Sequence, residues 1–168
     1  PLTFEFVFAS EEYCEYVGSQ FNDVFGFFVS GPGISGPFGG ADNIAILPGG
    51  GGYVAINNVN HLSNTGFYVN NTGANGTLCG QNASFLPSVN EVQFDGFTRK
   101  MIAVANVIPC ETYHIKLKIA DVGDGAFDSA VFLRDGSFDG GGNASIDFIV
   151  DGDIDDDDVF ESCGTVQL

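Results

Sequence analysis

Hydrophobic residues in this chain alternate with polar ones, and this two-residue period limits the possible folds more than any other feature. Between Thr112 and Ala120, the odd-numbered positions are apolar and most even-numbered ones are polar. Such a segment buries one face when it is an extended strand. No window of 11–18 residues shows a clean helical period that is free of an internal Gly, Pro or β-branched run. The pattern therefore predicts a chain built of strands.

Nine further segments have strand character and are bounded by residues that favour turns. They are the opening strand around Phe4–Phe8, Val24–Ser30, Asn43–Leu47, Tyr53–Asn57, Gly66–Asn70, Glu91–Phe94, Phe97–Val107, Ser129–Asp135 and Ser145–Val150. The Asp95-Gly96 pair predicts a hairpin between two of them. We predict an all-β fold, an antiparallel, jelly-roll-like β-sandwich with at most one short helical turn, at Ser10–Tyr16 with Ser10 as its cap.

One domain is expected over residues 1–138, because 168 residues suffice for a single hydrophobic core. Gly140–Gly142 then interrupts the pattern, and residues 139–168 contain the acidic run Asp151–Asp158. This tail is predicted to be an acidic linker into a following module, or a final strand that folds back onto the first. No segment approaches the roughly 20 apolar residues that span a bilayer, so direct membrane insertion is not expected.

The charge of the chain excludes two classes of partner. There are 22 Asp and Glu residues against 5 Lys and Arg, which gives a formal net charge of −17. Such a chain is repelled by phosphate backbones and by anionic lipid headgroups. We therefore expect neither nucleic-acid binding nor electrostatic docking on a membrane.

Four cysteines indicate an extracellular chain in which disulfides persist: Cys14, Cys79, Cys110 and Cys163. Cys110 precedes the strand at residues 112–120, and we place Cys14 beyond the other end of that strand. Nine residues at about 3.3 Å each separate the two by roughly 30 Å, which disfavours a bond between them. Cys79 is expected to pair with Cys14 or with Cys110.

Two acidic segments, around residues 11–15 and 121–128, are each predicted to lie at the end of a strand. If the opening strand leaves the sandwich at the same end as the others, these segments and Asp95 converge on one rim. Their carboxylates would repel one another unless a cation neutralised them, and Ca²⁺ prefers such oxygen ligands. The predicted ligands are Glu11, Glu12, Asn22, Asp23, Asp95, Asp121, Asp124 and Asp128.

The chemistry of these residues also limits the metal. The chain has no cluster of His and Cys that would favour zinc, and the acidic spacing does not match an EF-hand loop. Calcium is therefore the one cofactor that we predict. The alternative is that these acids are solvated turn residues whose side chains cap backbone N–H groups.

Aromatic residues are assigned by how well they tolerate water. Phe25, Phe27 and Phe28 are expected in the core. Four tyrosines are expected to be exposed, because a phenol tolerates a wet position; the candidates for ligand binding are Tyr13, Tyr16 and Tyr68, and the fourth is Tyr53. His114 is expected to be an exposed histidine of a sheet.

Several motifs together resemble one known family, the choice-of-anchor L domain. The similar segments are Phe6–Tyr13, Glu15–Ser19, Phe21–Phe28, Asn43–Ala45, Ile56–Asn60, Phe94–Thr98, Tyr113–Leu117 and Ala120–Leu133. The resemblance covers about residues 3–138. The insertion-like stretch Thr72–Pro87 departs from it, and the segment Glu161–Gly164 is similar to the start of a following adhesin repeat.

The resemblance implies a non-catalytic extracellular module. The family occurs in large secreted or surface proteins of gliding and predatory Bacteroidota-type bacteria, beside adhesin-like repeats and C-terminal sorting or anchoring signals. The expected location is therefore the outside of the cell, at the bacterial surface.

Three functions are compatible with these observations. The preferred one is a calcium-binding adhesion module that binds a cell-surface glycan or protein of a host, a prey or a neighbouring cell, next to other domains of its own chain. The alternative is a calcium-rigidified stalk or tip domain without a ligand. A glycan hydrolase using Glu12 and Asp121 is less favoured, because carboxylates that bind calcium are poor general acids, so we expect no enzyme.

Overall fold

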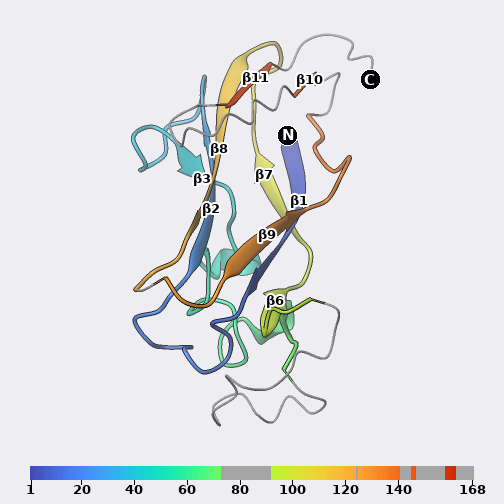
Figure 1. Ribbon diagram of the computed structural model, residues 1–168. Helices are drawn as coiled ribbons and strands as arrows, with labels where there is room; N and C mark the ends of the chain where they lie inside the picture. The colour runs from blue at the N-terminus through green and yellow to red at the C-terminus, as the bar shows by residue number, and fades with distance from the viewer. Residues whose placement is uncertain (73–91, 124, 141–144, 147–157, 162–168) are drawn as a thin grey trace.

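Two antiparallel β-sheets face each other in the computed structural model, which describes residues 1–72, 92–123, 125–140, 145–146 and 158–161 (Figure 1). The first sheet has the order β5-β6-β1-β7, with β9 also paired to β1. Its strands are β1 (Leu2–Ser10), β5 (Tyr68–Asn70), β6 (Gly96–Thr98), β7 (Met101–Ala105) and β9 (Ser129–Leu133).

The second sheet has the order β10-β11-β8-β2-β3, with β4 also paired to β2. Its strands are β2 (Val24–Ser30), β3 (Asp42–Asn43), β4 (Val54–Ala55), β8 (Thr112–Ala120), β10 (Ser145–Ile146) and β11 (Asp158–Glu161). The longest pairing joins β2 to β8, from Val24 opposite Ala120 to Ser30 opposite His114. The predicted all-β sandwich is confirmed.

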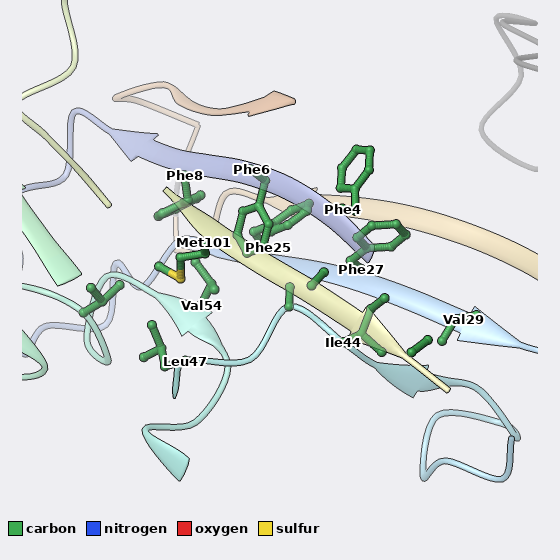
Figure 2. Packing of buried hydrophobic residues seen from close by; sticks show 14 of the residues in the cluster. Phe4, Phe6, Phe8, Phe25, Phe27, Val29, Ile44, Leu47, Val54 and Met101 are labelled. Carbon is green, nitrogen blue, oxygen red and sulfur yellow. The ribbon is translucent and has the colours of Figure 1, made fainter. Parts of the chain in front are cut away.

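The core lies between β1 and β2 and follows directly from the alternation in their sequences (Figure 2). Phe4, Phe6 and Phe8 point inward from β1, and Phe25 and Phe27 point inward from β2. The rings of Phe4 and Phe27 pack edge to face with centroids 5.0 Å apart. Burying a side chain of this kind contributes about 1.5–3 kcal/mol.

Several predicted strands are shorter than expected, and one predicted hairpin is wrong. Gly96 is the first residue of β6, and residues 92–95 do not form a strand. The side-chain amide of Asn71 instead donates to the carbonyls of Val92 and Phe94, at 3.1 and 2.8 Å. These side-chain hydrogen bonds take the place of the backbone hydrogen bonds that a strand at residues 91–94 would have made. The Asp95-Gly96 pair therefore leads into β6 and does not form the turn of a hairpin.

The predicted strand at residues 97–107 is divided between β6 and β7 by a bulge. From Ala9 to Phe6, β1 advances three residues, while its partner advances four, from Phe97 to Met101. The extra residue falls in the Arg99–Lys100 segment. A bulge of this kind bends a strand and increases its twist.

The segment expected to hold a helical turn, Ser10–Tyr16, forms no helix, although the Tyr16 N–H donates to the Glu12 carbonyl at 3.3 Å as in a single helical turn. Ser10 ends β1, and its hydroxyl accepts a hydrogen bond from the Glu12 N–H at 2.9 Å, so the chain continues as turns. Two short 3-10 helices occur elsewhere, at Pro48–Gly50 and Thr65–Phe67. No described helix is long and apolar enough to cross a membrane.

The tail contributes to the second sheet. In β11, Asp158 lies opposite Ile115 and Glu161 lies opposite Thr112, so this strand pairs with β8 and not with β1. The rest of the acidic run and the proposed link to a following module lie outside the described residues, as do Glu91 and residues 147–150 of two predicted strands.

Candidate functional site

Five strand ends meet at one end of the sandwich. Most of the acidic residues predicted to bind metal are close in sequence to one of these strand ends. The pairs Ser10–Gly96 and Ser10–Ser129 place the end of β1 beside the starts of β6 and β9. The pair Val24–Ala120 places the start of β2 beside the end of β8. We call this end the acidic rim.

Glu11 joins the two acidic segments of the rim. Its backbone N–H donates to the Asp128 carbonyl at 3.0 Å, and its carboxylate accepts the Asp128 N–H at 3.0 Å. Segments that are 117 residues apart in the chain are therefore held together, as the convergence on one rim requires.

Asp23 fixes the loop between β8 and β9. Its side chain is fully buried, and each carboxylate oxygen accepts one hydrogen bond, from the Val122 N–H at 3.0 Å and from the Ser129 hydroxyl at 2.7 Å. The neighbouring Asn22 accepts the Asn57 N–H at 2.8 Å. We call the Asp23 interactions with Val122 and Ser129 the Asp23 clamp.

A second group of carboxylates at the rim has a different environment. We name Glu11, Glu15 and Asp95 the acidic cluster. Burial and the negative charges of Glu15 and Glu11 raise the pKa of Asp95 to about 7. Burial also raises the pKa of Glu15, and the nearby backbone N–H groups of Glu15 and Cys14 offset part of that rise. Both oxygens of the Glu15 carboxylate are shielded from solvent.

Two tyrosines form the wall next to the acidic cluster. The rings of Tyr13 and Tyr68 lie 4.9 Å apart, and both contact Gly96. A Cβ atom at Gly96 would lie 2.7 Å from the Tyr68 hydroxyl oxygen and 2.9 Å from the Tyr13 ring, so only glycine fits there. Burial, then the charges of Asp95 and Glu15, raise the pKa of Tyr68. Within the part of the chain that the structure describes, the buried Tyr13 hydroxyl has no hydrogen-bond partner.

None of the five basic side chains, which all lie among the described residues, pairs with the acidic cluster: three bind other groups, and two lie on the second sheet. Glu5 binds Lys100 at 2.9 Å and Arg134 at 2.6 Å, and the Arg99 Nε donates to the Gly66 carbonyl at 3.0 Å. The other two lysines are on β8. The charges that raise the pKa of Asp95 are thus both negative, and no cationic side chain offsets them.

The structure brings together some of the predicted metal ligands and separates others. Glu11 and Asp95 belong to the acidic cluster, while Asn22 and Asp23 already accept hydrogen bonds from the protein. Glu12 is only 1% exposed and Asp121 is exposed, so substrate in solution cannot reach both carboxylates of the suggested hydrolase pair. Asp124 lies outside the described residues.

A metal ion has no preformed cage among the described residues, where no three His, Cys, Asp or Glu side chains are grouped closely enough to hold one. The donor chemistry of the acidic cluster is nevertheless that of a hard cation, since it offers only oxygen ligands. The role of calcium and of the predicted ligands therefore stays a prediction.

Sequence reasoning missed Glu15 and misjudged two tyrosines. Glu15 follows Cys14 in a turn region, where no periodic pattern indicates burial. Tyr13 and Tyr68, expected to be exposed, are buried because they pack on each other and on Gly96. Tyr16 is half-buried, while Tyr53 is exposed as expected.

Both cysteines in the described part of the chain, Cys14 and Cys110, are disulfide-bonded. Cys14 Sγ lies 3.6 Å from the Tyr68 hydroxyl, next to the acidic cluster. Cys79 and Cys163 lie outside the described residues, so the predicted pairing of Cys79 stays a prediction.

Comparisons with known proteins give one match. The comparisons with curated proteins and with solved structures found no match. The family model of the choice-of-anchor L domain matches residues 1–139, which is most of the chain and confirms the resemblance seen in its motifs. This family is a kind of non-enzymatic module of cell-surface or secreted proteins. The chain belongs to the choice-of-anchor L domain family.

Proposed function

We propose that this domain is a calcium-binding adhesion module, in which the ion binds at the acidic cluster and stabilises the rim. The observation that carries the proposal is the environment of Asp95, a half-buried carboxylate that lies beside the negative charges of Glu15 and Glu11 with no basic side chain to offset them. A divalent cation would remove this repulsion without requiring protonation.

The burial of Glu15 supports the proposal independently of the charge count. Both of its carboxylate oxygens are shielded from solvent, and the backbone N–H groups of Glu15 and Cys14 offset only part of the effect of burial. Burial still raises the pKa of this carboxylate, so a cation beside it would stabilise its ionised form. Because these side chains form no preformed cage, Glu11, Glu15 and Asp95 would have to move closer together to hold the ion, with backbone carbonyls and water completing the oxygen ligands that calcium prefers.

The position of the cluster explains what calcium would do for the domain. Glu11 connects the segment after β1 to the loop before β9, and Asp95 directly precedes β6. A bound ion would therefore cross-link three chain segments of the rim. The adhesive role itself is supported by the family, whose members belong to the cell surface, and the ligand would be a glycan or protein of another cell.

Thermal unfolding in calcium and in EDTA tests the calcium part. Calcium at 100 times its dissociation constant would stabilise the fold by about 2.7 kcal/mol, which raises the Tm by several degrees. Asp95→Asn is expected to abolish most of this rise. Asp42→Asn is the matched control, because Asp42 is an exposed residue of β3 in the other sheet. An unchanged Tm in calcium, or equal responses of the two variants, contradicts the proposal.

A glycan array probed in calcium and in EDTA tests the adhesive part. Reproducible binding would support an adhesion module, and loss of that binding in EDTA would show that the rim controls it. An array without hits, together with a calcium-dependent Tm, would favour the stalk domain instead.

A further inference from the structure

We propose that the outer face of the β2–β8 sheet is a binding groove for an acidic polysaccharide, a chain of uronic acid units. The inference rests on the proposed adhesive function and assigns it a site and a ligand class. The site lies on the opposite side of the β2–β8 sheet from the core and is separate from the acidic cluster.

Two adjoining hollows, of about 510 and 390 Å³, form this groove. They share Phe28, Phe38 and Lys118. Their floor consists of the outward residues of β2 and β8, which lie opposite one another as Ser30–His114, Phe28–Lys116 and Gly26–Lys118. We call it the aromatic groove.

Aromatic rings give the groove its apolar surface. Phe28, expected in the core, lies on the outer face instead, because β2 already buries Phe25 and Phe27 on its inner face. Its ring covers Gly26, where a Cβ atom would lie 2.4 Å from the ring. Gly26 thus allows the ring to lie along the floor of the groove.

A second ring is held over this floor by the loop between β2 and β3, which projects beside β3 (Figure 1). Backbone bridges Gly36–Gly40 and Phe38–Ala41 fold this loop into a small hairpin. Phe38 lies in this hairpin, 55% exposed, and its ring packs edge to face on Phe28 with centroids 5.0 Å apart. Tyr53, 46% exposed, lines the far part of the groove. Exposed rings of this kind provide flat apolar surfaces on which the C–H faces of sugars can pack.

The charge of the groove is opposite to that of the chain. Lys116 and Lys118 are two of only five Lys and Arg residues, against 22 acids, and none of the described residues that line the groove is acidic. With His114 they occupy alternate positions of β8, so they form a row with a spacing of about 7 Å. Lys118 lines both hollows and places a positive charge beside the strip of aromatic rings, which matches a sugar polymer that carries a carboxylate on each unit.

Calorimetric titration of the whole domain with galacturonate oligomers tests this inference. The expected result is binding that falls about tenfold or more, equivalent to 1.4 kcal/mol per tenfold step, in Lys118→Glu and in Phe38→Ala. Lys100→Glu is the matched control, because Lys100 is an exposed lysine on the other sheet. The methyl-esterified oligomer, which lacks the charge, should bind more weakly than the acid.

Three results would contradict the proposal that the aromatic groove binds an acidic polysaccharide. The first is that the wild type does not bind galacturonate oligomers, and the second is that both groove variants bind them as the wild type does. The third is equally tight binding of poly-glutamate, which would point to an acidic protein partner. The same experiments distinguish this inference from the proposed function. If the domain bound another glycan in a calcium-dependent way and Lys118→Glu left that binding intact, only the assignment of the aromatic groove as the binding site would be wrong. Galacturonate binding without any calcium response would overturn only the calcium site.

Discussion

Asp23 and Asp95 lie at the same end of the molecule, yet the surroundings of their carboxylates differ. The Asp23 clamp supplies a hydrogen-bond donor to each oxygen of a fully buried group. Asp95 is half-buried beside Glu15 and Glu11, whose charges, with burial, raise its pKa to about 7. The fold therefore satisfies both oxygens of the first carboxylate with hydrogen bonds, while it places the second beside two negative charges.

This difference separates a structural acid from a candidate binding acid. Both residues belong to strand ends that the sequence predicts to converge, and both appear among the predicted metal ligands. Only the hydrogen-bond donors around each one distinguish their roles. The same distinction applies to two buried tyrosines, Tyr113 and Tyr13, of which only the first has partners for its hydroxyl.

The largest effect is expected for Asp23→Ala. The change leaves the Val122 N–H and the Ser129 hydroxyl without their acceptor and should lower the free energy of unfolding by about 3 kcal/mol. Urea unfolding measures this loss. Asp42→Ala, at an exposed position, is the control and should change stability by less than about 0.5 kcal/mol. Equal losses for the two variants would show that the clamp has no special role.

Removing the two tyrosine hydroxyls should give effects of opposite sign. Tyr113 accepts the Ile108 N–H at 2.7 Å and donates to the Pro32 carbonyl at 2.8 Å, so Tyr113→Phe should lose about 1–2 kcal/mol of unfolding free energy. Tyr13→Phe removes a buried hydroxyl without a partner and should leave stability unchanged or raise it by up to about 1 kcal/mol. A loss in Tyr13→Phe as large as that in Tyr113→Phe would mean that the Tyr13 hydroxyl has a partner that the structure does not show.

A smaller effect is expected from pH in the presence of EDTA. The pKa of Asp95 is about 7 in the folded state against an ordinary value of 3.8, so the folded state binds the proton more tightly than the unfolded state. The stabilising contribution of protonated Asp95 is therefore present at low pH and is lost as the pH rises through about 7. Because the group is half-exposed and screened by solvent, we expect a loss of only about 1 kcal/mol between about pH 5 and pH 8.

The variant Asp95→Asn sharpens this pH experiment. An amide does not titrate, so the variant should be more stable than the wild type at about pH 8, and the difference should shrink as the pH falls. Chemical unfolding of both proteins across this range gives the comparison. Parallel pH profiles for the two proteins would exclude Asp95 as the titrating group.

The long strands were predictable because local sequence determines them. Alternation predicts β8 and the inward side of β1, and a run of residues that favour strands predicts β2; the bounds of β2 and β8 are those that the structure shows. The β6–β7 segment was not predictable, because the bulge at Arg99–Lys100 depends on pairing with β1, and the Asn71 side chain takes the carbonyls that a hairpin would have used. Local sequence does not specify such long-range partners.

The rim was predictable in outline only. Strand direction shows that the acidic segments lie at one end, but the hydrogen-bond donors that distinguish Asp23 from Asp95 come from residues about 100 positions away. Glu15 was missed because its burial depends on the path of an irregular loop. Phe28 was misplaced for a related reason: two of three neighbouring phenylalanines must share a face of the strand, and the third then faces outward.

Calorimetric titration of calcium into the wild-type domain, with Glu15→Gln as the comparison, measures whether the acidic cluster binds the ion. We expect saturable binding with a dissociation constant of about 0.1–1 mM, the range of extracellular calcium modules, and its loss in Glu15→Gln. No binding heat up to several times about 1 mM calcium, or equal binding by the variant, would contradict it.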